Sequence, residues 1–283
     1  MTGQVPQHRF RPLGVVTSRI GLGCAALIGR QTFKAAARLV ETALDLGIRY
    51  FDTAPLYGMG TAEEVLGAVI GDSRDVIIAT KVGISRPTYS PLKASLRRLS
   101  KPVLDRSQLL KGCARALYVR SAHFSGTGPS QQTLRDLGDD AVRRELEVSL
   151  QRLRRSRADV YLAHDPVPEN LGPHTEAVFQ ALLTEGQIGT FGVAINGISG
   201  PSGSFGSVWQ SRWSSPARVS DPIKPTQVFH GVIRNAPKDR FGRMLVNPAS
   251  LLRLAMQEAP DAVFLVAAST PERLRQVTEE VLV

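Results

Sequence analysis

Three segments of the chain end in side chains that can hold or move a proton. Asp52 and Tyr57 lie in GIRYFDTAPLYG, and Lys81 lies in IIATKVG. His164 closes the apolar run of a third segment, YLAHDP. Because parallel strands in a barrel deliver the residues at their carboxyl ends to one rim, we expect these four side chains to meet in a catalytic site.

These residue types suit the reduction of a carbonyl group by hydride, since the developing alkoxide needs a proton. An isolated tyrosine, with a pKa of about 10, holds its proton too tightly near neutral pH. We expect the Lys81 ammonium to lower the pKa of Tyr57, and Asp52 to keep that lysine protonated. His164 is expected to hydrogen-bond the carbonyl oxygen and fix it for attack. These roles need no metal ion. A purely structural ion pair of Asp52 and Lys81 is the alternative.

The motifs around these residues resemble those of the aldo-keto reductase family. GIRYFDTAPLYGMGTAEEVLGAVI resembles the second strand and helix of that family, including the Glu-x-x-Leu-Gly pattern from Glu63 to Gly67. IGLGCAALIG is similar to its first strand, and RRELEVSLQRLRRSRADVYLAHDP to the helix and strand that end at the histidine. The His-Asp-Pro ending looks most like the branch of aldose dehydrogenases that act on fucose or threo-aldoses. The resemblance implies an α/β fold of the (β/α)8 barrel type, an Asp-Tyr-Lys-His tetrad and a nicotinamide cofactor.

The resemblance also implies residues that hold the nicotinamide end of the cofactor. Gly23 and Cys24 stand at the end of the first strand, and Asp52 at the end of the second. Asn196, in EGQIGTFGVAINGI, and Gln227, in TQVFHGVI, are expected to bind the carboxamide from the fifth and sixth strands.

A second cofactor contact is implied near the end of the chain. AVFLVAASTPERLRQV resembles the eighth strand and the loop that grips the adenosine phosphate, where Ser269 and Arg273 fit. A guanidinium beside a helix N-terminus suits a 2′-phosphate, so NADP (NADPH) is expected, with NAD as the alternative. Ala268 stands where the family often has a lysine, which weakens this preference.

Apolar strand-like runs alternate with amphipathic helical runs, which predicts a parallel sheet wrapped by helices. The expected strands cover 20–25, 48–52, 76–81, 159–164, 189–195, 226–233 and 262–267. The expected helices cover 32–46, 61–70, 140–154, 174–184, 248–258 and 271–281. HRFRPLGVVTSR, before the first strand, resembles the hairpin that closes the bottom of the family's barrel. A chain of 283 residues with 42% hydrophobic content can build one large core, so we expect a single domain over 1–283.

The alternation of strands and helices breaks down between Gly197 and Val246. Residues 197–225 are rich in Gly, Ser and Pro, which predicts an irregular loop in place of the helix after strand five. Farther on, only RMLV at 243–246 is available for a seventh strand. We therefore expect a degenerate region around strands five to seven, with a barrel that is locally open, trimmed or completed by another subunit.

The net charge of +10 is concentrated in a basic insertion at about 84–138. Between Arg86 and Arg120 this insertion carries one acid, Asp105, against seven further basic residues, Lys93, Arg97, Arg98, Lys101, Arg106, Lys111 and Arg115. Loops that follow barrel strands lie on the active-site rim, which favours a lid over a polar or anionic carbonyl substrate. A solvated basic surface is the alternative. Nucleic acid is not an expected partner, because no helix-turn-helix, zinc-finger or RNP pattern accompanies the charge.

The cysteines and the lengths of the apolar runs indicate the cellular compartment in which we expect this protein. Cys24 and Cys113 lie far apart and show no Cys-x-x-Cys spacing, so neither a zinc site nor a disulfide framework is indicated, and a reducing cytoplasm fits. No run approaches the roughly 18 apolar residues of a membrane span, and the N-terminal segment lacks a signal-peptide core. We expect neither export nor a membrane partner, and the oligomeric state stays open.

Competing interpretations remain for both fold and function. GLGCAA satisfies the short Gly-x-Gly-x-x-Ala form of the Rossmann fingerprint, with Glu41 as the ribose-binding acid. However, residues 27–30 intervene before helical periodicity starts, and a Rossmann fold leaves the tetrad unused. The function we expect is NAD(P)(H)-dependent interconversion of a carbonyl and an alcohol. The alternatives are a catalytically weakened regulatory subunit that binds the nicotinamide cofactor, and a non-redox enzyme that reuses the tetrad.

Overall fold

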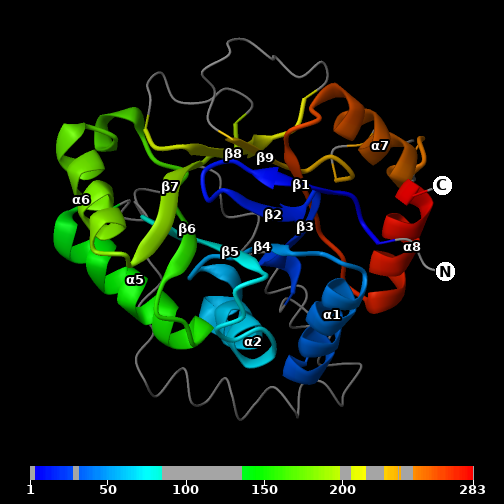
Figure 1. The fold of residues 1–283 in the computed structure, drawn as a ribbon, viewed down its shortest axis with the longest axis horizontal. Coiled ribbons are helices and arrows are strands. Elements are labelled where there is room, and N and C mark those ends of the chain that lie inside the picture. Colours follow the sequence, from blue (N-terminus) through cyan, green and yellow to red (C-terminus); the bar gives the residue numbers. More distant parts are fainter. Residues whose placement is uncertain are drawn as a thin grey trace, which may run out of the picture. The chain divides into compact units, whose positions relative to one another are not determined.

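The computed structural model describes residues 4–27, 32–84, 136–197, 205–214, 226–234, 236 and 245–282. Eight parallel strands close into a barrel in the order β10-β3-β4-β5-β6-β7-β8-β9 (Figure 1). They are β3 (Ile20–Gly23), β4 (Tyr50–Asp52), β5 (Ile77–Val82), β6 (Ala158–His164), β7 (Ile188–Ala194), β8 (Val208–Arg212), β9 (Thr226–His230) and β10 (Val263–Val266). The expected (β/α)8 barrel is confirmed.

Six α-helices of the described residues lie around the barrel (Figure 1). They are α1 (Phe33–Asp45), α2 (Thr61–Val69), α5 (Asp139–Leu153), α6 (Pro173–Thr184), α7 (Pro248–Glu258) and α8 (Pro271–Leu282). Each coincides closely with an expected helix, because each carries an apolar stripe and a recognisable start. In α1, Thr32 caps the first turn by accepting a hydrogen bond from the backbone N–H of Ala35, and Ala36, Leu39, Val40 and Ala43 form its buried face.

The first strand is followed by a short 3-10 turn, η1 (Cys24–Ala26), and α1 begins only at Phe33. A dinucleotide-binding Rossmann unit needs a helix that starts within the glycine turn. The structure therefore rules out the Rossmann interpretation of GLGCAA, and the glycines of this segment belong to a barrel strand.

An antiparallel hairpin precedes the barrel, formed by β1 (Gln7–Phe10) and β2 (Val15–Ser18). Phe10 at its tip is fully buried and packs with residues that point into the barrel, including Tyr50, Val160 and Val263. The rings of Phe10 and Tyr50 lie 5.6 Å apart between centroids. The hairpin thus fills one end of the barrel, as its resemblance to the family's bottom hairpin implies.

The region after β7 departs from the expectation in two ways. Residues 208–212, inside the predicted irregular loop, form strand β8, so that β9 is the seventh strand rather than the sixth. The chain closes its own barrel, and the expected opening or completion by another subunit is wrong. The described parts of this region contain no helix between β7 and β9, as the degenerate pattern predicts. Leu245 and Val246, the described part of RMLV, are not in a strand.

The composition of β8 does not predict a strand, and its position beside β7 depends on two glycines. The sequence VWQSR is short and half polar, and it stands among Gly, Ser and Pro residues that predict loops. A Cβ at Gly192 of β7 would lie 1.8 Å from the Val208 carbonyl oxygen, and one at Gly206 would lie 2.4 Å from the Phe191 carbonyl oxygen. The missing side chains let β8 lie against β7.

The basic insertion predicted at about 84–138 lies outside the described residues, apart from Ile84 and residues 136–138. Its role as a lid therefore stays a prediction, as does the expectation of a single domain over 1–283.

Candidate active site

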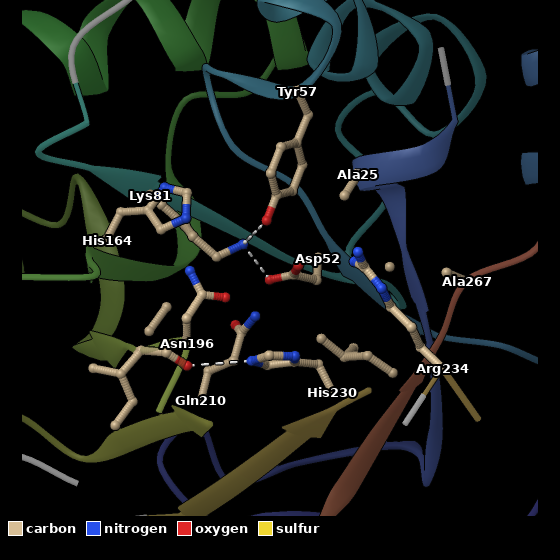
Figure 2. A pocket seen from close by; sticks show the side chains of 14 residues that line it. Ala25, Asp52, Tyr57, Lys81, His164, Asn196, Gln210, His230, Arg234 and Ala267 are labelled. Atoms are coloured by element: carbon tan, nitrogen blue, oxygen red, sulfur yellow. Dashed lines mark hydrogen bonds and ion pairs between the residues drawn. The ribbon is translucent and has the colours of Figure 1, made fainter. Parts of the chain in front are cut away.

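A pocket lies at the carboxyl ends of the strands, and every strand of the barrel contributes to its lining. The contributing strand residues, in chain order, are Gly23, Asp52, Lys81, His164, Ala194, Gln210, His230 and Leu265. Tyr57, Asn196 and Arg234 reach the same pocket from the turns that follow β4, β7 and β9 (Figure 2). The geometry of a parallel barrel thus gathers side chains that are far apart in sequence.

Lys81 is the most enclosed group of the site, with 1% of its surface exposed. Its Nζ donates to Asp52 Oδ1 at 2.6 Å and to the Thr53 carbonyl oxygen at 2.8 Å. A third contact, at 3.4 Å, reaches the Tyr57 hydroxyl (Figure 2). Burial disfavours the ammonium, but the attraction of Asp52 and Tyr57 outweighs it and raises the pKa of Lys81. Lys81 is therefore a charged donor with all three of its protons directed at acceptors.

Tyr57 stands at the start of a tight turn, η2 (Tyr57–Gly60), in which Gly58, Met59 and Gly60 all have positive φ. The Lys81 Nζ lies 4.9 Å from the centre of the Tyr57 ring, and the His164 ring approaches edge-on at 6.2 Å between centroids. Burial raises the pKa of Tyr57, and the opposing effect of Lys81 does not cancel it. Lys81 thus acts in the expected direction, but burial is the larger effect, and Tyr57 carries its proton at neutral pH.

Glu63 lies in the first turn of α2, a position where an acidic side chain usually stabilises the positive end of the helix. Here it instead contacts residues of other elements. Its carboxylate is fully buried, and Oε1 accepts a hydrogen bond from Thr80 Oγ at 2.9 Å. Oε2 lies 3.5 Å from Nη1 of Arg152 on α5. The same guanidinium fills the space beside Gly60, where a Cβ would lie 2.3 Å from Nη1. Glu63 thereby ties the Tyr57 turn to the strand that carries Lys81.

A hydrogen bond between Asp165, which follows His164, and the backbone of Asn196 connects the turns that carry His164 and Asn196. Asp165, directly after His164, has a φ of 47°, which turns the chain sharply at the end of β6. Its Oδ1 accepts a hydrogen bond from the backbone N–H of Asn196 at 3.4 Å. This contact holds the turns after β6 and β7 together, so that both side chains line the pocket.

A model of the Aldo/keto reductase family matches residues 19–199 of this chain. The chain belongs to this family. The match covers the barrel from the end of the hairpin to the end of β7, and all four tetrad positions lie within it.

Curated relatives agree with this assignment. The chain is 29% identical over 188 residues to Aldo-keto reductase YhdN of Bacillus subtilis (strain 168), across 64% of this chain and 44% of the relative. It is 28% identical over 197 residues to the NADH-specific methylglyoxal reductase of Escherichia coli (strain K12), across 65% and 51% of the two chains. The matched part spans about half or less of these relatives' length.

Solved structures show the same fold along the whole chain. An aldo-keto reductase from Bacillus halodurans in its holo form superposes with a TM-score of 0.69 at 18% identity, across 99% of this chain and 92% of that one. The glycerol dehydrogenase from Gluconobacter oxydans gives a TM-score of 0.65 at 18% identity, across 98% and 90%. These likenesses show that the chain has the barrel fold of solved aldo-keto reductases.

Two residues expected at the nicotinamide end of the cofactor lie outside the pocket. The Cys24 thiol is buried in the core beneath the rim, 3.6 Å from the Leu22 carbonyl oxygen, whereas Gly23 and Ala25 line the pocket. Gln227, at the second position of β9, is half-buried but does not line it. Because β8 precedes β9 in the barrel, the glutamine that lines the pocket is Gln210.

The residues expected at the adenosine phosphate lie at the start of α8. Ser269 is exposed just before the helix, and Arg273 is half-buried in its first turn. The backbone N–H of Arg273 donates to Thr270 Oγ at 3.2 Å, and its guanidinium lies 2.7 Å from the side-chain oxygen of Gln276. Neither residue lines the tetrad pocket.

Sequence reasoning missed three pocket residues, which are Gln210, His230 and Arg234. Gln210 is buried, and its Oε1 has no hydrogen-bond partner. His230 Nε2 lies 3.2 Å from the Ile195 carbonyl oxygen, and burial lowers the pKa of His230. Gln210 is the middle residue of β8, so recognition of β8 was the signal that would have found it. His230 ends β9, which was expected as a strand, and Arg234 lies in the turn that follows.

The described part of the chain shows neither a metal-binding cluster nor a membrane-spanning helix. Its residues contain no group of three or more His, Cys, Asp and Glu side chains suited to a metal ion. None of its helices is long and apolar enough to cross a membrane.

Proposed function

We propose that this reductase interconverts a carbonyl compound and its alcohol with a nicotinamide cofactor, with Tyr57 as the proton donor. The observation that carries the proposal is the buried contact of Lys81 with Asp52 and with the Tyr57 hydroxyl, next to His164 in one pocket. A protonated phenol beside a fixed ammonium can give up a proton and leave a stabilised phenolate.

The pocket also contains a group that fits the nicotinamide carboxamide. A buried acceptor without a partner is costly, and Gln210 Oε1 is such an atom at the pocket wall. The amide N–H of a carboxamide would supply the missing hydrogen bond. Asn196, across the pocket lining, offers a further amide for the same group.

The proposed mechanism of reduction uses each tetrad residue once. His164 orients the carbonyl oxygen toward the Tyr57 hydroxyl. A bound nicotinamide cofactor would supply the hydride for the carbonyl carbon. Tyr57 transfers its proton to the oxygen as the C=O bond becomes a C–O bond, which completes the alcohol. Lys81 then stabilises the phenolate, and Asp52 holds the ammonium in place.

NADPH is the proposed cofactor, with NADH as the alternative. Arg273 at the start of α8 favours a 2′-phosphate. However, Glu272 in the same turn holds a carboxylate whose pKa is lowered by a backbone N–H and by Thr270. This negative charge opposes an anionic ligand at the helix start, so we expect a preference for NADPH of less than about tenfold.

The proposed substrate is a small polar or anionic carbonyl compound, such as an aldose, since the pocket lining includes two histidines and an arginine. The His-Asp-Pro motif supports the aldose-dehydrogenase branch. A cytoplasmic location stays a prediction from cysteine usage.

The first experiment is a titration with NADPH and NADH, followed by quenching of Trp209 and Trp213 fluorescence. We expect micromolar binding that Arg273→Ala weakens for NADPH alone. Turnover of a panel of aldehydes and aldoses then tests the redox step. Absence of binding to either nucleotide would exclude this function and leave the non-redox alternative.

The second candidate is a weakly catalytic, cofactor-binding subunit. The end of the family match at residue 199, before β8 and β9, favours it, because five of the 14 residues that line the pocket then lie outside the matched range. Tight nucleotide binding without turnover of any carbonyl in the panel would support this candidate.

A further inference from the structure

The turn that carries Tyr57 has a backbone conformation that is unfavourable on its own. Gly58, Met59 and Gly60 all have positive φ, which is strained for a residue with a side chain such as Met59. The Tyr57 hydroxyl lies 3.4 Å from Lys81 Nζ, at the long end for a hydrogen bond, so small shifts of the turn decide whether the contact exists. The placement of the hydroxyl therefore depends on what packs against the turn.

A stripe of residues on α2 faces the end of α5, which lies beside it (Figure 1). Gly60, Glu63 and Gly67 are spaced i, i+3 and i+7, which puts them on one face of the helix. A Cβ at Gly67 would lie 2.1 Å from the backbone carbonyl oxygen of Arg152, so a glycine is needed for α5 to approach so closely. The Glu-x-x-Leu-Gly motif thus provides a contact surface for Arg152.

The side chain of Arg152 extends along this stripe toward the Tyr57 turn. Its backbone lies against Gly67, and its Nη1 lies 3.5 Å from Glu63 Oε2. At the far end, Nη1, Cζ and Nε would lie 2.3, 2.6 and 2.9 Å from a Cβ at Gly60. Because three atoms of the guanidinium meet this one position, the whole planar group lies against the glycine, and not only its tip.

We propose that Arg152 is a positioning residue for proton transfer, which supports the Tyr57 turn at Gly60 and thereby sets the distance from the Tyr57 hydroxyl to Lys81. Arg152 does not line the pocket, so it acts through the turn. The Glu63 carboxylate directs the guanidinium, and the guanidinium itself makes the contact with the turn. This inference rests on the proposed function, in which Tyr57 is the proton donor.

The first test compares Arg152→Ala and Arg152→Lys with Arg144→Ala. Arg144 is an exposed arginine of the same helix, so its removal changes the net charge equally. Steady-state kinetics with a carbonyl compound that the unaltered protein reduces give kcat and KM, and tryptophan fluorescence gives the dissociation constant for NADPH. Circular dichroism checks the fold of each variant.

We expect Arg152→Ala to lower kcat by about tenfold to a hundredfold, because a small misplacement of the hydroxyl slows proton transfer. The dissociation constant for NADPH should change by less than about twofold. Arg152→Lys should recover only part of kcat, since an ammonium keeps the charge beside Glu63 but not the planar contact with Gly60. Folded Arg152→Ala with the kcat of Arg144→Ala would overturn the inference. So would weaker NADPH binding with unchanged kcat.

A second test measures the contact without any turnover. Gly60→Ala and Arg152→Ala are made singly and together, and urea denaturation gives the midpoint of each variant. A Cβ at Gly60 must displace the guanidinium, so the loss caused by Gly60→Ala should be smaller where Arg152 is already alanine. Gly186→Ala is the control, because Gly186 also has a positive φ, 75°, but a Cβ there meets nothing within 4 Å. Its loss should be the same in both backgrounds.

The two tests separate failure of the contact from failure of the proposed function. Additive losses from Gly60→Ala and Arg152→Ala would overturn the inference whether or not a substrate is found. Absence of turnover by the unaltered protein would reject the proposed function and, with it, the role in proton transfer. If Arg152→Ala does not fold, Gly60→Ala serves for the kinetic test, and a kcat equal to that of Gly186→Ala would overturn the inference.

Discussion

Tyr57 is subject to two opposing effects, and their balance sets the chemistry of the site. Burial raises the pKa of its hydroxyl, while the Lys81 ammonium, 3.4 Å away, lowers it. The net result is a phenol that keeps its proton through the neutral range. In the proposed mechanism, Lys81 therefore does not create a phenolate before the reaction. It stabilises the phenolate that forms when Tyr57 gives up its proton.

The pH dependence of carbonyl reduction follows from this balance. Because the pKa of Tyr57 lies above its ordinary value of 10.0, loss of its proton should not slow reduction below about pH 10. Steady-state rates from pH 7 to 11 check this, with Tyr57→Phe expected to lose about 10²–10⁴-fold in kcat. The dissociation constant for NADPH should stay unchanged in that variant. An alkaline loss of rate with a midpoint near pH 8 would contradict the raised pKa.

Glu63 offers a second prediction for a single residue. Glu63→Gln keeps the size of the side chain and an acceptor for Thr80, but it removes the negative charge that faces Arg152. We expect a loss of about 1–3 kcal/mol in the free energy of unfolding and a lower kcat, because the Tyr57 turn loses a support. Urea denaturation and steady-state kinetics measure both. Glu64→Gln, one position along α2, is the matched control and should stay within about 0.5 kcal/mol. Equal effects in the two variants would contradict the role of Glu63.

At the scale of elements, β8 is the strand on which the pocket most depends. Gly192→Ala would place a Cβ against the Val208 backbone, which cannot move aside as a flexible side chain could. We expect displacement of β8 and Gln210, with a loss of about 1–3 kcal/mol in stability and weaker nucleotide binding. Fluorescence titration and thermal unfolding measure the two effects. Gly172→Ala is the control, since a Cβ there meets nothing within 4 Å. Normal binding by Gly192→Ala would show that Gln210 is not needed.

The elements differ in how far the sequence could predict them. Helices such as α7, with an Asn247 cap and a proline in its first turn, carry their own signals in consecutive residues. Strand β8 does not, because its Trp209 and Ser211 are only half-buried and its place depends on glycines in other segments. Because β8 was not recognised in the sequence, β9 was counted as the sixth barrel strand instead of the seventh. The glutamine expected on strand six was therefore identified as Gln227 instead of Gln210. The role of Glu63 was missed because its partners Thr80 and Arg152 are distant in sequence.

At the scale of the whole molecule, several buried groups limit the pH range of stability. The pKa values of Tyr50, Tyr57, Lys81 and Tyr161 are raised, so their contribution is complete below about pH 10 and is lost as the pH rises further. Burial lowers the pKa values of His8 and His230 from 6.5, so their contribution is lost as the pH falls below that value. Burial also raises the pKa of the Cys24 thiol from 9.0, so the contribution of this group is lost as the pH rises above about 9. We expect a plateau in the free energy of unfolding between about pH 6.5 and 9. Urea denaturation across pH 5 to 11 tests this, and a single sharp maximum inside that range would contradict it.

Different strands supply different parts of the pocket, and this affects how the ligand specificity of such an enzyme can evolve. Asp52, Lys81 and His164 come from β4 to β6, within the part that matches the family, whereas Gln210, His230 and Arg234 come from β8 and beyond. In the proposed function, the residues for proton transfer and those that contact the ligands are thus encoded in separate stretches of the gene. Recombination or insertion after β7 can alter what the enzyme accepts without disturbing how it reacts. Exchange of the β8–β9 segment between relatives is therefore a rational route to new specificities.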